Sequence, residues 1–193
     1  MNKMKVAFVS LICYDYLYKK LIDQHPEDPD YFDREIWTDD SDVVHKRVKM
    51  LLDYGVNIEL WYPACYSKGV KSFKHRLGHN MKRISGFQTQ RYFSKYLPCD
   101  GSFLLLKELK KNRVTHVILL NYLMNGNLLV DMSDVLIFFC NLNHIYVFPM
   151  YGGWTIEDYN FLKLRSKLYF LKKADGFICE SQSELRVMVD KYK

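Results

Sequence analysis

Short apolar runs alternate along this chain with longer segments of helical periodicity, and this alternation constrains the fold more than any other feature. The expected strands are largely apolar and rich in β-branched residues: Val6–Ile12, Val56–Trp61, Thr115–Leu120, Ile145–Phe148 and Gly176–Cys179. A weaker strand is expected within Lys82–Phe93. Strands of this kind are buried on both faces, which indicates a parallel sheet covered by helices.

The segments between the strands carry the periodicity of amphipathic helices: Ser41–Tyr54, Ser102–Asn112, Ser133–Leu142, Thr155–Lys173 and Glu184–Tyr192. In the first of them Val44 and Val48 lie on one stripe, and Gly55 follows as a helix stop. A strand at Val135–Phe139 is the alternative to the third helix. Alternating strands and helices predict an α/β fold: a doubly wound, mainly parallel Rossmann-like sheet with helices on both faces, in a single domain of residues 1–193.

In sheets of this type ligands bind where loops leave the carboxyl ends of the strands. The expected loops are Cys13–Thr38, Tyr62–Lys74, Asn121–Asn127, Pro149–Thr155 and Glu180–Ser183. They supply the candidate cleft residues Tyr14, Asp15, Asn121, Tyr122, Gly152, Gly153, Trp154, Glu180 and Ser181. Gly152 and Gly153 separate a strand from a helix, where free amides and the helix dipole can hold an anion. A tight turn that requires glycine is the alternative explanation.

Two common nucleotide-binding motifs are missing from the sequence. No glycine lies in Ser10–Tyr14, where a dinucleotide fingerprint would follow the first strand. The chain also lacks the phosphate-binding loop that ends in Gly-Lys-Ser or Gly-Lys-Thr. These absences argue against an NAD enzyme of the usual type and against a nucleoside triphosphatase.

The compartment is predicted from the first residues and from the cysteines. Met1–Ile12 has a basic start and an apolar core, but no small-residue cleavage site follows, so it is interpreted as a strand. No run of about 18 apolar residues occurs, and we therefore expect no membrane span. The five cysteines are odd in number and none are spaced as Cys-x-x-Cys, which favours free thiols in a reducing cytoplasm.

The net charge of +6 is distributed unevenly along the chain. Asp23–Asp42 is rich in acids, whereas Lys68–Lys95 contains cations and aromatic residues but no acid. We expect an interaction surface for an anionic membrane, on the inner face, formed by Lys68, Lys71, Lys74, Arg76, Lys82 and Arg83. Ordinary solvated charge is the alternative, and we do not expect a nucleic acid partner.

His75 and His79 are spaced four residues apart, which is one spacing found in zinc sites. The glutamate of the HExxH motif is missing, and Gly78 disfavours a helix there. We therefore predict that the chain holds no metal and that these histidines belong to a solvated basic surface.

The order of elements from Met4–Ser10 through Asp53–Pro63 and Thr115–Leu120 resembles the N-terminal domain of the family-four glycosyltransferases. The most specific segment is Lys173–Glu184, because an Ala-Asp strand closes that domain in the family. The resemblance implies the B-type fold of two facing Rossmann-like domains. It also implies retaining transfer of a sugar from a nucleotide-sugar donor, without a metal held by a DxD motif.

The same resemblance implies a division of labour in which the N-terminal domain shapes the acceptor site and the C-terminal domain holds the nucleotide. We therefore expect this chain to be the acceptor-binding half, inactive alone and without a cofactor of its own. The expected partners are a sugar or lipid-linked acceptor and a C-terminal donor domain or partner chain. The alternative is a stand-alone binding or regulatory module for an anionic small molecule.

Overall fold

The computed structural model describes residues 4–10, 23–28, 31, 43–64, 69–85, 100–122, 130, 132–151 and 161–192. Its strands are β1 (Val6–Ser10), β2 (Ile58–Ala64), β3 (Val70–Lys74), β4 (Asn80–Ser85), β5 (His116–Tyr122) and β6 (Tyr146–Tyr151). Its helices are α4 (Val43–Asp53), α5 (Asp100–Lys111), α6 (Met132–Leu142), α7 (Phe161–Leu171) and α8 (Gln182–Tyr192). Outside the consecutive strands β2, β3 and β4, strands and helices alternate as predicted, and Ser133–Leu142 is helical rather than extended.

The strands form one six-stranded sheet in the order β3-β4-β2-β1-β5-β6. Every neighbouring pair is parallel except β3 and β4, which are antiparallel. From β1 the chain builds the β2 side of the sheet first and then returns to place β5 and β6 on the other side. The strand order therefore reverses between β1 and β5, which confirms the doubly wound fold.

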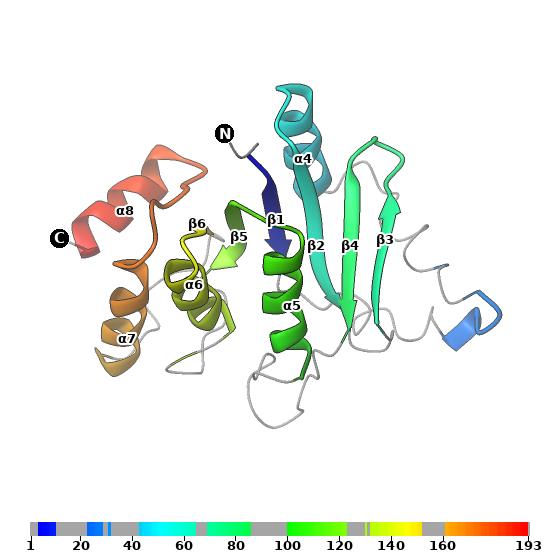
Figure 1. The fold of residues 1–193 in the computed structure, drawn as a ribbon. Helices are drawn as coiled ribbons and strands as arrows, with labels where there is room; N and C mark the ends of the chain where they lie inside the picture. The colour runs from blue at the N-terminus through cyan, green and yellow to red at the C-terminus, as the bar shows by residue number, and fades with distance from the viewer. Residues whose placement is uncertain are drawn as a thin grey trace.

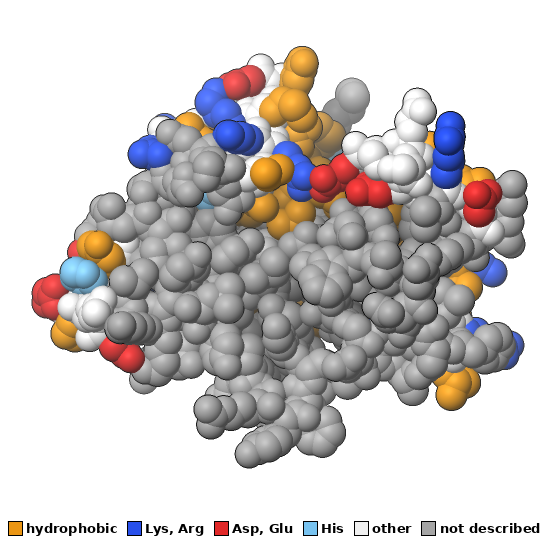
Figure 2. Space-filling view, turned by 180° about the vertical axis from the view of Figure 1, so that it is seen from behind, with side chains coloured by type: hydrophobic (Ala, Val, Ile, Leu, Met, Phe, Trp, Pro, Cys, Tyr) orange, Lys and Arg blue, Asp and Glu red, His pale blue; other side chains and the backbone are white. Residues whose placement is uncertain are grey.

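Helices cover both faces of this sheet (Figure 1). Alternation along each strand divides the core, since in β1 Val6 and Phe8 belong to one buried cluster and Ala7 and Val9 to the other. The first cluster packs against α4, and the second packs against α5 and α6. Figure 2, the view from behind, shows side chains of both charge signs along the upper rim of the described surface.

The end of α4 is fixed by local sequence. Gly55 takes a positive φ of 79°, and its amide donates to the carbonyl of Leu52 at 2.9 Å. The amide of Val56 donates to the carbonyl of Leu51 at 3.1 Å. These two bonds form a Schellman motif, so the predicted helix stop at Gly55 is confirmed.

The hairpin of β3 and β4 corrects the prediction for this part of the chain. The weak strand expected within Lys82–Phe93 begins earlier, at Asn80. The loop expected at Tyr62–Lys74 is wrong in part, because it contains the end of β2 and all of β3. β3 is an edge strand whose alternate residues are exposed, and its two lysines make it resemble a polar loop in sequence.

The predicted strand Gly176–Cys179 is present only as a short extension of the sheet beside β6. Ile178 pairs with Met150 in a parallel bridge, and its amide donates to the carbonyl of Pro149 at 2.9 Å. The amide of Asp175 donates to the carbonyl of Val147 at 3.0 Å, and the Asp175 carboxylate accepts from the Val147 amide at 2.8 Å. The Asp175 carboxylate thus accepts a hydrogen bond that a backbone carbonyl accepts in a regular parallel ladder.

Candidate functional site

The carboxyl edge of the sheet is the first place where a ligand site is expected, at the reversal between β1 and β5. Asn121 and Tyr122 are the last two residues of β5 and therefore lie at this edge. Several predicted cleft residues lie outside the described part of the chain: Tyr14, Asp15, Gly152, Gly153 and Trp154. The anion site proposed for the glycine pair stays a prediction.

Glu180 and Ser181 follow the short parallel extension and both have structural partners. The Glu180 carboxylate accepts from the Arg47 guanidinium of α4 at 2.6 Å, and both side chains are partly exposed. The hydroxyl of Ser181 accepts from the amide of Glu184 at 3.2 Å, while the Glu184 carboxylate accepts from the amide of Glu180 at 2.6 Å. Ser181 therefore caps the start of α8.

Arg47 is a site residue that sequence reasoning missed. Besides its ion pair with Glu180, its guanidinium lies 3.5 Å from the sulfur of Met150 at the end of β6. A single arginine on an amphipathic helix carries no sequence signal for such a contact, because Met150 is 103 residues away. Arg47 and Glu180 together place a paired charge beside the last residues of β6.

The predicted basic surface is wrong for two of its members, because Lys82 and Arg83 are each only 6% exposed. Lys82 lies on the α5 face of β4, where its ammonium donates to Asn112 at 2.8 Å and approaches the Glu108 carboxylate at 3.4 Å. It also lies 4.5 Å from the centre of the Trp61 ring. A buried carboxylate, an amide and an aromatic face thus replace the solvent around this cation.

The remaining described cations of the segment keep access to solvent. Lys74 and Arg76 are exposed and Lys71 is half-buried, all on or next to β3 at the sheet edge. Lys68 lies outside the described residues. An anionic membrane partner for these side chains stays a prediction.

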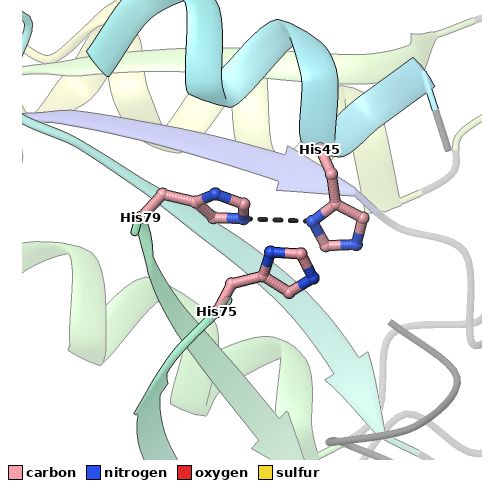
Figure 3. A group of neighbouring side chains, drawn as sticks. All are labelled: His45, His75 and His79. Carbon is pink, nitrogen blue, oxygen red and sulfur yellow. Dashed lines mark hydrogen bonds between the residues drawn. The ribbon is translucent and has the colours of Figure 1, made fainter. Parts of the chain in front are cut away.

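A cluster of three buried histidines is the most distinctive constellation among the described residues. His45 projects from the first turn of α4 toward His75 and His79, which flank the turn between β3 and β4 (Figure 3). His45 and His79 are fully buried and His75 is 5% exposed. The predicted solvated surface is therefore wrong for this pair, because α4 covers the turn.

The three rings are in mutual contact. His45 Nδ1 and His79 Nε2 share a hydrogen bond of 3.0 Å, and the rings of His45 and His75 stack with centroids 4.2 Å apart. The Nδ1 of His75 accepts from the amide of Leu77 at 3.2 Å. One nitrogen of each ring lies within 4.8 Å of one nitrogen of each other ring. These residues are thus close enough together to share one metal ion.

The protonation states of two of the rings follow from their surroundings. Burial, and then the neighbouring rings of His75 and His79, lower the pKa of His45 from 6.5 to about 3. Burial, followed by His75 and the ammonium of Lys49, lowers the pKa of His79 from 6.5 to about 4. Both imidazoles are therefore neutral at pH 7 and keep a lone pair for a hydrogen or a metal.

The i,i+4 spacing of His75 and His79 indicates two of the three members of this cluster. His45 carries no sequence signal for the cluster, because it lies 34 residues before His79 and belongs to a different element. Only the packing of α4 over the hairpin brings the three together.

The buried Cys140 thiol and the buried Lys167 ammonium serve structural roles. Burial, together with the nearby Asp175 carboxylate, raises the pKa of the Cys140 thiol to about 12, so it is protonated and a poor nucleophile at pH 7. The ammonium of Lys167 in α7 pairs with the carboxylate of Asp134 in α6, and both side chains are fully buried. This ion pair joins the two helices.

Within the residues that the structure describes, no helix has the length and apolar character to cross a membrane. Comparison of the chain with models of known protein families and with curated proteins found no match.

Proposed function

We propose that this chain is the acceptor-binding domain of a retaining glycosyltransferase that transfers a sugar from a nucleotide-sugar donor. The donor would bind mainly to a second domain or partner chain, and this chain alone would be inactive. The acceptor would lie at the carboxyl edge of the sheet, beside Asn121 and Tyr122 and near Glu180.

The observation that carries the proposal is the parallel pairing of Ile178 with Met150. It places the segment with the most specific resemblance, Lys173–Glu184, beside β6, where a closing strand is expected. The doubly wound strand order supports the same proposal, since it creates a ligand site at the carboxyl edge. Folds of this kind serve many activities, and the assignment therefore needs a binding experiment.

The experiment is isothermal titration of the 193-residue chain against two sets of compounds. One set contains uridine- and guanosine-diphosphate sugars, and the other contains oligosaccharides and short-chain lipid-linked sugars. We expect binding within the second set and no measurable binding of nucleotide sugars. Tight binding of a nucleotide sugar with turnover would contradict the proposed division between donor and acceptor halves, and absence of any sugar binding would contradict the acceptor role.

A matched pair of variants localises the acceptor. Glu180→Gln keeps the size of a partly exposed side chain at the proposed site and removes its charge. We expect it to weaken acceptor binding about 10-fold or more, the effect of losing one charged hydrogen bond. Asp53→Asn is the control, because this exposed carboxylate lies at the end of α4, next to the start of β2 and therefore at the opposite edge of the sheet. Equal effects of the two variants would rule out an acceptor site at Glu180.

A further inference from the structure

The histidine cluster joins two elements that are otherwise separate in the chain, α4 and the turn between β3 and β4. We propose that His45, His75 and His79 form a zinc site that fastens this turn to α4. The proposal goes beyond acceptor binding, because it concerns a different set of residues and requires no sugar.

The ligand chemistry favours zinc among the common divalent ions. The cluster offers nitrogen ligands, one from each ring, and neutral imidazole suits zinc and neighbouring transition metals. Calcium and magnesium prefer oxygen ligands and are not expected here. The three rings would supply three of the four ligands of a tetrahedral zinc ion, so one position remains for a further ligand.

The distances show how much of the site exists already. Two nitrogens that bind the same tetrahedral zinc ion at about 2.0–2.1 Å lie about 3.3 Å apart. His45 Nδ1 and His79 Nε2 are separated by 3.0 Å, close to that spacing. These two nitrogens therefore need to move apart only slightly to accept the ion between them.

His75 requires the larger change. Its ring is stacked on that of His45 at an angle of 8°, whereas imidazoles that share an ion point their lone pairs at one centre. Its Nδ1 also accepts the hydrogen bond from the Leu77 amide. Zinc binding must therefore rotate this ring or exchange that hydrogen bond for a bond to the metal. The amide of Leu77 becomes a reporter of the event.

A metal ion would fix the tautomer of the buried His79 ring. The Nδ1 of His79 is buried and makes no hydrogen bond to any residue that the structure describes. A buried polar atom left unsatisfied is unfavourable and calls for an explanation. In a zinc site Nε2 would bind the ion and Nδ1 would carry the proton, and this N–H would then donate to an acceptor such as a water molecule.

The surroundings of the cluster oppose a cation only weakly. The ammonium of Lys49 lies near His79, but it is paired with the carboxylate of Asp53 one turn later in α4. An open groove runs between this part of α4 and the turn, and its lining residues are Lys46, Lys49, Met50, Asp53, Tyr54 and Leu77. The groove reaches the turn at Leu77, two residues after His75.

The test uses the untagged chain, first stripped of metal with a chelator. We expect one equivalent of zinc to bind and to raise Tm by about 5–10 °C when free zinc exceeds Kd by 100-fold. Magnesium and calcium should leave Tm unchanged. In spectra of 15N-histidine protein, zinc should shift the rings of His45, His75 and His79. The rings of His25, His116 and His144 should not shift.

His75→Gln is the main variant, because the residue lies at the turn and its loss leaves α4 and the core strands intact. Removing a ligand should weaken zinc binding by at least about 100-fold, and the zinc-dependent rise in Tm should disappear. His116→Gln, a histidine of β5, is the matched control and should bind zinc as the wild type does. The Leu77 amide should shift with zinc in the control and not in His75→Gln.

Three results would overturn the proposal. They are a wild-type chain that takes up no stoichiometric zinc, zinc affinity in His75→Gln equal to that of His116→Gln, and zinc-induced shifts confined to other histidines. If His75→Gln fails to fold, the 15N-histidine spectra of the wild type decide the question. None of these results bears on sugar binding, so this proposal and the acceptor role fail separately.

Discussion

At the scale of single residues, two buried lysines are each paired with a carboxylate on a helix. Lys82 of β4 meets Glu108 of α5 and Asn112 just after that helix, and Lys167 of α7 meets Asp134 of α6. A buried ion pair adds little net stability when it is intact, but loss of one partner leaves a charge without compensation. These residues therefore contribute to the correct placement of helices more than to total stability.

The pair of Lys167 and Asp134 permits a direct test of this argument. Asp134→Asn should lower the free energy of unfolding by about 3–5 kcal/mol, because it removes the Asp134 carboxylate from beside the buried Lys167 ammonium. The double variant Asp134→Leu with Lys167→Met should recover most of that loss. Urea denaturation measures both. Asp53→Asn, which breaks an exposed pair in α4, is the control and should change the value by less than about 0.5 kcal/mol.

The Glu108 carboxyl should make the free energy of unfolding depend on pH. Burial acts to raise its pKa, but hydrogen bonding from Asn112 and the charge of Lys82 outweigh burial, so the pKa lies below its ordinary value of 4.5. A carboxyl with a depressed pKa contributes stability above its unfolded pKa and loses it as pH falls through its folded pKa. Glu108→Gln should therefore cost about 1–3 kcal/mol at pH 7, because the Lys82 ammonium loses its charged partner.

The difference between wild type and Glu108→Gln should shrink as pH falls below about 4.5. Urea denaturation at several pH values measures it. Lys111→Gln removes the exposed partner of the same carboxylate and should leave the pH profile nearly unchanged. A constant difference between Glu108→Gln and wild type from pH 7 to pH 3 would contradict a role for Glu108 ionisation.

At the scale of elements, α4 is defined by its end and by its contacts. The Schellman motif at Gly55 ends the helix just before β2, and Val44 and Val48 fasten it to the sheet. His45 and Arg47 lie two residues apart on this helix. His45 contacts the β3–β4 turn, and Arg47 contacts Met150 of β6. One helix therefore contacts both flanks of the doubly wound sheet.

Gly55→Ala tests the end of this helix. A Cβ at this position would meet nothing within 4 Å, so the cost of the substitution comes from the positive φ alone. We expect the free energy of unfolding to fall by about 1 kcal/mol. Gly55→Asn is the comparison and should cost less, since asparagine tolerates the left-handed region better. An alanine variant as stable as the wild type would show that the Schellman turn does not constrain α4.

At the scale of the whole molecule, the two candidate sites depend on the same framework in different ways. The carboxyl edge follows from the strand order and could be located from the sequence once the fold was predicted. The histidine cluster follows from the packing of α4 over an edge hairpin, and β3 of that hairpin was not predicted. A site built on such a contact cannot be derived from the order of elements alone.

The sequence by itself determined the alternation of strands and helices, the end of α4 at Gly55 and the buried stripes of Val44 and Val48. Hydrophobic periodicity and turn residues act over a few neighbouring positions, so they are readable in one dimension. Only the tertiary structure decided that His45 joins His79, that Lys82 is buried against Asn112 and that Arg47 meets Met150. These partners are 34, 30 and 103 residues apart, and their contacts depend on how the sheet brings distant segments together.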